Sequence, residues 1–575
     1  MKLLIRYLKP FAPRMALGLA IKITATMAEL MLPFILSYVL RVVVARESLQ
    51  EILLWGGVMI LCAALAVVMN ITANRMAAAV SCQFSRAVRH DLFRRTLHLS
   101  AAQTDRFTIP SLESRITTDT YNVHHFAGMM QRMGVRAPIL LIGGICITLF
   151  MDRHLAMVML CMLPIVFALI FFISRRGVPL FAKVQASLDG MIRVVREDTQ
   201  GIRVIKALSK QDYEHRRYDA VNRALVADEI RAKTVMSLVS PVMGVLMNCG
   251  IVAVVSLAAF RVSGGTSAPE TVIAFMQYFT QISMALMSIN RMFTAYTKCA
   301  ASAQRIAEVL DTPQDLSLRS PEELPPTQDD AHIRFDDVTF AYPNKKKPSL
   351  DHVSFSLPKG GWLGIIGATG SGKSTLVKLL LRFYDVTSGS IRINGRDVRT
   401  IPKPELYDMF GTAMQFDFLY ADTVEENIRF GRPLTHEQVE YAAVTAQAHD
   451  FISAFPDGYG HMLSQKGTNI SGGQKQRLLI ARAVAAQPDI LVLDDSSSAL
   501  DYRTDAALRQ ALAQRVTNST VITVAQRVSS IKDCNLILVL DEGRVIGAGD
   551  HESLLANCPQ YAQISQSQMG GAFVE

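Results

Sequence analysis

Two short segments about a hundred residues apart constrain the fold of this chain more than any other feature. The first is the glycine-rich run Gly367-Ala368-Thr369-Gly370-Ser371-Gly372-Lys373-Ser374-Thr375, which follows a short apolar run. The second starts at Ile470-Ser471-Gly472-Gly473-Gln474 and ends with an apolar run that carries Asp494 and Asp495. Either segment alone would fit an ordinary tight turn or core strand. Together they predict a phosphate-binding loop and a buried strand that brings a carboxylate to a Mg²⁺ site.

The glycine-rich run has the residue types that a phosphate loop requires at each position. Gly367, Gly370 and Gly372 allow the backbone to approach a nucleotide closely. Lys373 is suited to reach the β- and γ-phosphates, and Ser374 is suited to be a ligand of Mg²⁺. Because a helix follows, its first N–H groups and its dipole also favour the negative charge of phosphate. ATP and Mg²⁺ are therefore the expected cofactors.

The residues around these segments alternate between short apolar runs and helix-like runs from His332 onward. The expected strands are Ile333 to Tyr342, Leu350 to Leu357, Trp362 to Ile366, Ser390 to Ile393, Phe410 to Met414, Ile490 to Leu493, Val521 to Val524 and Ile537 to Leu540. This alternation predicts an α/β nucleotide-binding domain with a parallel core over residues 332–575. Proline and acidic residues over 311–331 predict a linker before it.

Residues 1–310 have a different character, in a chain that is half hydrophobic with a mean hydropathy of +0.23. Apolar runs long enough to span a bilayer are expected at about 15–40, 52–78, 128–150, 155–176, 236–260 and 271–296. Lys and Arg are frequent in the long polar stretches 79–127 and 177–235, which places these stretches and both termini in the cytoplasm. The same bias accounts for the net charge of +9, so no nucleic-acid partner is expected. The sequence predicts an all-α multi-pass domain in the lipid bilayer of a cell membrane.

Ionisable side chains within the expected spans need a reason because charge is costly there. Lys22 is near enough to a span end for its ammonium group to snorkel out of the membrane. Glu29 lies deeper and fits either a contact with the transported substrate or a hydrogen bond between helices. In the sixth span, Gln277, Gln281 and Met284 fit either ordinary helix packing or an adaptable substrate cavity.

In these motifs the chain resembles an ATP-binding-cassette (ABC) transporter of the exporter type, a half-transporter with one membrane domain and one nucleotide-binding domain. The resemblance implies that Gln415 contacts Mg²⁺ and the γ-phosphate, and that Tyr342 stacks on adenine. For Tyr342 alone, an ordinary aromatic at a strand end is the alternative. By the same resemblance, the membrane helices would run far below the membrane as long cytoplasmic extensions. The segments from His98 to Tyr121 and from Glu197 to Tyr218 would carry the short helices that couple the two domains. These segments would otherwise be plain soluble helical loops.

The sequence departs from the family pattern at two catalytic positions. The residue after the strand aspartate Asp494 is a glutamate in the family, where it polarises the attacking water, and here it is Asp495. The family's histidine that contacts the γ-phosphate is here Gln526, which donates hydrogen bonds but carries no proton. Loss of a well-positioned base costs about 10² to 10⁴ in rate. This chain's own site is therefore expected to bind ATP and hydrolyse it slowly.

The signature run Ser471-Gly472-Gly473-Gln474 is intact, with Ile470 in place of the usual leucine. In this family two nucleotide-binding domains meet head to tail, and the signature of one chain completes the ATP site of the other. A weak catalytic site beside a good signature implies the degenerate half of a heterodimer, as in heterodimeric bacterial multidrug exporters. A slow homodimer in which Asp495 still works is the alternative.

The resemblance implies ATP-driven export of a hydrophobic or amphipathic substrate, which would be a small molecule, a lipid or a peptide. The partner would be a second half-transporter with glutamate and histidine at its own site. An importer of metal chelates with the exporter fold and an ATP-gated channel or regulator are the rival functions. A soluble mechanical ABC ATPase is excluded by the six spans.

Overall fold

The computed structural model describes residues 1–46, 48–263, 269–327, 330–343, 345, 347–415 and 418–569. Contacts divide the chain into two compact units. The first comprises Met1–His98 and Ile109–Thr312, and the second comprises Leu99–Thr108 and the chain from Pro313 onward. The last helix of the first unit ends at Leu310 and the first strand begins at Ala331, while the linker over 311–331 stays a prediction.

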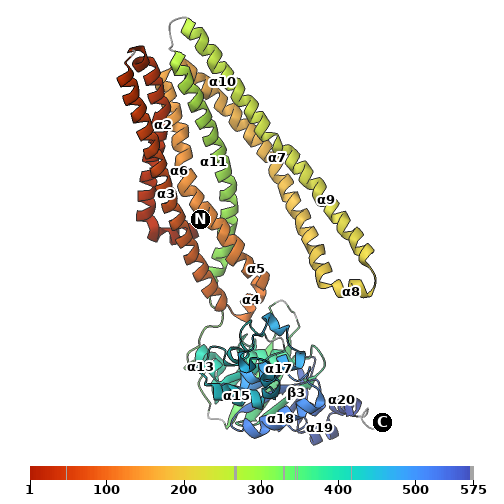
Figure 1. Ribbon diagram of the computed structural model, residues 1–575. Coiled ribbons are helices and arrows are strands. Elements are labelled where there is room, and N and C mark those ends of the chain that lie inside the picture. Colours follow the sequence, from red (N-terminus) through yellow and green to blue (C-terminus); the bar gives the residue numbers. More distant parts are fainter. Residues whose placement is uncertain are drawn as a thin grey trace. The chain divides into compact units, whose positions relative to one another are not determined.

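In the part of the chain that the structure describes, the first unit consists of helices and short connections (Figure 1). Its α-helices are α1 (Lys2–Leu8), α2 (Ala12–Tyr38), α3 (Leu49–Leu97), α5 (Ile109–Ser114), α6 (Thr120–Met151), α7 (Arg153–Gln200), α8 (Ile202–Ala207), α9 (Gln211–Ser237), α10 (Val239–Ser263) and α11 (Pro269–Leu310). Six helical segments of the described chain are long and apolar enough to cross a membrane, and each expected span falls within one of them. The predicted six-helix all-α domain is confirmed.

Several of these helices are much longer than a bilayer is thick. Helix α3 has 49 residues, which corresponds to about 74 Å at the α-helical rise of 1.5 Å per residue, against a hydrocarbon core of about 30 Å. The polar stretches 79–127 and 177–235 therefore begin as continuations of the spans and not as loops. Figure 1 shows α7 and α9 side by side, joined at one end by the short helix α8.

Small residues allow the helices around α6 to pack closely. A Cβ atom on Gly143 would lie 2.7 Å from Leu30 Cδ1 of α2, and one on Gly144 would lie 2.9 Å from Ile282 Cγ1 of α11. The Tyr278 hydroxyl of α11 also donates a 2.6 Å hydrogen bond to the backbone oxygen of Leu30. Close approach at small residues is the usual way in which membrane helices associate. Helices α2, α6 and α11 thus form one packed group.

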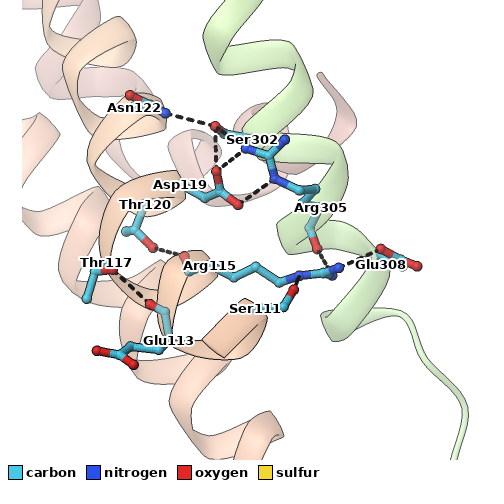
Figure 2. Close-up of polar contacts among 10 residues, drawn as sticks. All are labelled: Ser111, Glu113, Arg115, Thr117, Asp119, Thr120, Asn122, Ser302, Arg305 and Glu308. Atoms are coloured by element: carbon cyan, nitrogen blue, oxygen red, sulfur yellow. Dashed lines mark hydrogen bonds and ion pairs between the residues drawn. The ribbon is translucent and has the colours of Figure 1, made fainter. Parts of the chain in front are cut away.

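A buried polar network joins the N-terminal end of α6 to the C-terminal end of α11 (Figure 2). It is built on the π-helical turn η4 (Arg115–Asp119), a local distortion of the helix. The Asp119 carboxylate is 1% exposed and accepts hydrogen bonds from Ser302 Oγ and Arg305 Nε, both at 2.8 Å. Arg115 donates to the backbone oxygen of Arg305 at 2.6 Å and pairs with Glu308 at 3.0 Å.

The second unit contains two sheets. The four-stranded sheet has the order β2 (Leu350–Pro358), β1 (Ala331–Phe340), β4 (Ser388–Ile393), β5 (Arg396–Asp397) and is antiparallel. The six-stranded sheet has the order β10 (Arg544–Gly549), β9 (Leu536–Asp541), β3 (Trp362–Gly367), β8 (Thr520–Val524), β7 (Ile490–Asp494), β6 (Phe410–Ala413). All its neighbours are parallel except β10 and β9. Parallel strands place their carboxyl ends at one edge, where ligands bind in such folds.

Helices surround these sheets and complete the predicted α/β fold, which is confirmed. They are α12 (Lys373–Leu380), α13 (Lys403–Asp408), α14 (Val424–Arg429), α15 (His436–Thr445), α16 (His449–Ser453), α17 (Gly472–Val484), α18 (Tyr502–Arg515), α19 (His551–Asn557) and α20 (Pro559–Met569). The core strand β7 is buried at every position because helices cover both faces of a parallel sheet.

The short helix α4 (Ala101–Phe107) lies between α3 and α5 in the chain but belongs to the second unit. Its Asp105 accepts a 2.6 Å hydrogen bond from Tyr384 Oη, and Ser100 before it donates to Asp315 at 2.6 Å. Ala101 and Ala102 pack against the hydrophobic core of that unit. The helices α4 and α8 fall in the segments expected to hold coupling helices, and a coupling role for them stays a prediction.

Candidate functional site

The phosphate loop connects the end of β3 to the start of α12. Gly370 and Gly372 have φ angles of +87° and +104°, which side chains other than glycine rarely adopt. A Cβ atom on Gly372 would also lie 2.6 Å from the backbone oxygen of Ser349. The Lys373 ammonium donates 2.8 Å hydrogen bonds to the backbone oxygens of Gly367 and Ala368. The lysine thus lies within the loop, with the first N–H groups of α12 beside it.

Burial and charge act in opposite directions on this lysine. Burial lowers the pKa of Lys373, while the carboxylates of Asp494 and Asp495 raise it. Burial raises the pKa of Asp494, which is the last residue of β7 and only 2% exposed. The Lys373 ammonium would attract a phosphate at this edge, and the carboxylates of Asp494 and Asp495 would attract a cation. The loop therefore suits a charged ligand.

The residues beside the loop fit a magnesium ion. Ser374 Oγ donates a 3.3 Å hydrogen bond to Asp494 Oδ1, so a hydroxyl and a carboxylate oxygen lie close together. Mg²⁺ prefers hard oxygen ligands and is usually held by one or two protein groups together with phosphates. The structure contains no cluster of three or more His, Cys, Asp or Glu suited to a metal among the residues it describes.

Asp495 is held by the two glutamines that the sequence places in the same site. Gln415 Nε2 and Gln526 Nε2 donate to Asp495 Oδ2 at 3.3 Å and 3.1 Å. Asp495 itself has a φ of +51°, an uncommon conformation for a residue with a side chain. Burial raises the pKa of Asp495, and the hydrogen bond from Gln415 opposes this shift. Residues 415, 495 and 526 therefore form one cluster although they lie on three separate segments.

One cavity of about 220 Å³ gathers most of the predicted nucleotide residues. Its lining includes Tyr342, Thr369, Gly370, Gly372, Lys373, Ser374, Thr375, Gln415, Asp494, Asp495 and Gln526. The Tyr342 hydroxyl lies 3.3 Å from Thr375 Oγ1, which fixes the ring beside the start of α12. Lys345 also lines the cavity and lies 5.9 Å from the Tyr342 ring centroid, but the sequence analysis missed it. The run of three lysines at 345–347, just after Tyr342, is the sequence pattern that could have indicated this residue.

The signature residues lie at the start of α17 and outside the lining of this cavity. Ser471 Oγ accepts from Gln474 N at 3.3 Å, and Gln474 Oε1 accepts from Ser471 N at 2.9 Å, which forms a capping box. A Cβ atom on Gly473 would lie 3.3 Å from the backbone oxygen of Ala499. Gly472 and Ala499 line a separate cavity of about 450 Å³ together with Gln415. Gly472 of the signature and the residues of the phosphate loop thus line different cavities of the unit.

The first unit contains a cavity of about 110 Å³ lined by three of the four predicted substrate residues, Glu29, Gln281 and Met284. Gln277 is exposed and lies outside this lining. The sequence analysis missed Arg136, which also lines the cavity and pairs with Glu29 at 2.5 Å. The sequence pattern that could have indicated Arg136 is the presence of two arginines, Arg132 and Arg136, within the third expected span.

The snorkelling interpretation of Lys22 is wrong. The residue is 4% exposed, and its ammonium group donates to Asn70 Oδ1 at 2.6 Å and to Asn74 Oδ1 at 3.1 Å. Two amide oxygens from α3 therefore take the place of water around this charge. The sequence alone does not reveal which faces of α2 and α3 meet, so the hydrogen bonds from Lys22 to Asn70 and Asn74 could not be predicted.

Comparisons with known proteins agree with this architecture. Residues 15–286 match the family model for the ABC transporter transmembrane region, and residues 350–498 match the family model for the ABC transporter. An uncharacterised ABC transporter ATP-binding protein of Mycobacterium bovis is 33% identical over 576 residues, which cover all of this chain and 99% of that protein. The ATP-dependent lipid A-core flippase of Vibrio cholerae is 31% identical over 84% of this chain and 83% of its own length.

Among solved structures, a bacterial Atm1-family ABC exporter with ATP bound has the same fold. Its TM-score is 0.81 over 98% of both chains, at 23% sequence identity. A helical membrane unit and a phosphate-loop unit in one chain define an ATPase coupled to transport. The chain belongs to the ABC transporters, as a multi-pass half-transporter whose membrane region and ATP-binding domain are fused.

Proposed function

We propose that this chain is the degenerate-site half of a heterodimeric ABC exporter in a bacterial cell membrane, with both termini in the cytoplasm. The observation that carries the proposal is the cluster around Asp495, in which two neutral glutamine amides surround a carboxylate that is one methylene shorter than the family's glutamate. Neither Gln415 nor Gln526 can accept a proton from water at neutral pH. The chain's own ATP site is therefore weakly hydrolytic.

ATP binding is assigned to residues that the aspartate substitution leaves intact. The proposed nucleotide contacts are Tyr342, Gly367, Ala368, Thr369, Gly370, Ser371, Gly372, Lys373, Ser374, Thr375 and Asp494. The loop amides and Lys373 hold and orient the phosphates, and Tyr342 presents its ring for the base. Ser374 and Gln415 are the proposed Mg²⁺ ligands, and a bound Mg²⁺ would neutralise phosphate charge at this edge of the sheet.

The signature residues Ser471, Gly472, Gly473 and Gln474 are assigned to the ATP held by the partner chain. Two features support this assignment: the capping box fixes the start of α17, and the signature glycines lie outside the chain's own nucleotide cavity. Gln476 also ties α17 to the loop after β7, because it accepts from Ala499 N at 2.9 Å and donates to Ser498 Oγ at 3.2 Å. The productive composite site therefore combines this signature with a partner's catalytic glutamate and histidine.

The proposed cargo is a hydrophobic or amphipathic molecule that contacts Glu29, Gln281 and Met284. The relative from Vibrio cholerae is named a lipid flippase, which supports a lipid-like cargo. Methionine and leucine side chains at the cavity would accommodate an apolar tail of variable shape.

The test compares ATP turnover of this chain alone in lipid with that of the same chain co-purified with the subunit encoded by a neighbouring gene. Negligible turnover alone and robust turnover of the pair are expected. Robust turnover of the chain alone would mean that Asp495 is an adequate base and that the protein works as a homodimer, which contradicts the proposed asymmetry.

A further inference from the structure

The membrane unit holds an excess of positive charge around the Glu29 cavity. Glu29 is the only carboxylate within the six expected spans, while the first and third of these spans hold Lys22, Arg132 and Arg136. Lys22 and Glu29 lie on α2, Arg132 and Arg136 lie on α6, and α2 packs against α6 with Arg136 paired to Glu29, so we treat these four side chains as one charged cluster. Three cations and one carboxylate leave an excess of two positive charges.

Of these cations, Arg136 is paired with Glu29, while Lys22 and Arg132 have no carboxylate within ion-pair distance among the residues that the structure describes. Lys22 is bound by the neutral amides of Asn70 and Asn74. Arg132 lies one helical turn before Arg136, and no carboxylate of the described chain lies within ion-pair distance of it. Uncompensated charge within a membrane domain is costly and is usually kept for a functional reason. An anion is the ligand that would remove this cost.

Arg136 is the cation of this cluster that lines the cavity. Its Nη2 and Nε donate to Glu29 at 2.5 Å and 3.3 Å, which uses two of the five N–H donors of a guanidinium group. Its side chain is 42% exposed, so it remains accessible beside Glu29. The planar donor fork of arginine matches the oxygens of phosphate and carboxylate groups.

The rest of the cavity is suited to an apolar chain. Met133, Leu140, Met284 and Ala285 line it next to Arg136, and Gln281 and Ser288 supply two further polar groups. The cavity lining thus combines the paired charges of Arg136 and Glu29 and two neutral polar side chains with apolar side chains, of which the methionines are flexible.

We infer that this cavity binds an amphiphile with an anionic headgroup, of the phosphate or carboxylate type, whose oxygens are held by Arg136 within the cationic cluster. In this role Glu29 competes with the ligand for Arg136 and keeps the guanidinium group in place when the ligand is absent. The inference rests on the proposed transport function only in taking this ligand as the cargo. Binding itself requires no ATP turnover.

The experiment measures binding by isothermal titration calorimetry with the full chain in phosphatidylcholine nanodiscs, with empty nanodiscs as the blank. The probes are octyl phosphate, octyltrimethylammonium and inorganic phosphate, which separate the headgroup from the tail. The variants are Arg136→Gln, Arg136→Lys and Glu29→Gln. Arg153→Gln is the matched control, because it removes an exposed guanidinium group at the start of α7, outside the cavity.

Octyl phosphate is expected to bind at least about tenfold more tightly than octyltrimethylammonium, and inorganic phosphate only weakly. Arg136→Gln should remove the preference for the anion, Arg136→Lys should keep part of it, and Arg153→Gln should leave it unchanged. Glu29→Gln should strengthen the binding of octyl phosphate, because the competing carboxylate is gone.

Equal affinity for the two octyl compounds would overturn the inference, and so would an unchanged dissociation constant in Arg136→Gln. Weaker binding in Glu29→Gln would show that the ion pair is a structural element and not a ligand site. Tight binding of inorganic phosphate would refute the amphiphilic part. ATP binding to the same nanodiscs tests the second unit separately, so a failure there would not be confused with a failure here.

Discussion

The nucleotide site can be tested by restoring the two side chains that the family pattern expects, Asp495→Glu together with Gln526→His. The added methylene extends the carboxylate from the end of β7 into the cavity, and the imidazole replaces an amide that now donates to Asp495 at 3.1 Å. Because the signature of this chain is intact, two copies of the double variant would form two complete composite sites. The chain purified alone should therefore gain ATP turnover.

The expected gain is about 10²-fold, which corresponds to about 2.7 kcal/mol of activation free energy. A missing general base costs about 10² to 10⁴, and the lower end applies here because Asp495 still presents a carboxylate in the cavity. Lys373, Ser374 and the loop glycines are unchanged, so ATP binding should stay within about threefold of the original.

The assay is phosphate release by the chain alone in lipid nanodiscs, with ATP binding measured on the same samples. Each single variant should give less than the double variant. Asp541→Glu, which lengthens an exposed aspartate at the end of β9, is the control for a general effect of the added methylene. The reasoning is refuted if the double variant binds ATP normally as a dimer but turns it over no faster than the original chain.

The same assignments lead to further expectations. Lys373→Ala should weaken ATP binding to the chain alone by at least about tenfold and leave turnover of the co-purified pair partly intact, and a complete loss of that turnover would contradict the asymmetric model. Ser471→Ala should reduce turnover of the pair more than Asp495→Asn does, and the opposite order in a phosphate-release assay would sink the assignment of the signature to the partner's ATP. Asp119→Asn should lower the free energy of unfolding by roughly 1–2 kcal/mol, at the low end for a buried pair because the Arg305 side chain is 49% exposed. A thermal-unfolding cycle with Arg305→Gln should show losses smaller than additive, and strictly additive losses would mean that the pair contributes nothing.

The nucleotide unit was largely predictable because its chemistry is encoded locally. The loop from Gly367 to Thr375 needs positive φ angles and small residues at fixed positions, and these requirements are visible in one line of sequence. The adjacency of Asp495 and Gln526 also follows from local patterns. Each residue comes just after a buried strand, and the parallel pairing of β7 with β8 brings the two strand ends together.

The membrane unit was predictable in its number of spans and not in its contacts. Hydropathy identifies an apolar run but carries no information on which face of one helix meets which face of another. Glu29 and Arg136 are 107 positions apart, and their pairing depends on the packing of α2 against α6. The resemblance to exporter-type membrane domains did imply that the helices extend far beyond the membrane, and α3 and α7 continue into the polar stretches as implied.

Gln415 connects the two functional regions of the nucleotide unit. It lines the nucleotide cavity, where it donates to Asp495, and it also lines the second cavity with Gly472 and Ala499. A ligand that changes the position of Asp495 must therefore either keep or break the hydrogen bond from Gln415, and each choice changes the wall of the second cavity. Since Gly472 of the signature forms another part of that wall, the proposed ATP site of this chain and the surface proposed to meet a partner's ATP share the side chain of Gln415. A slowly hydrolysing site would then act mainly as a long-lived ATP-bound state that holds Gln415 in one position.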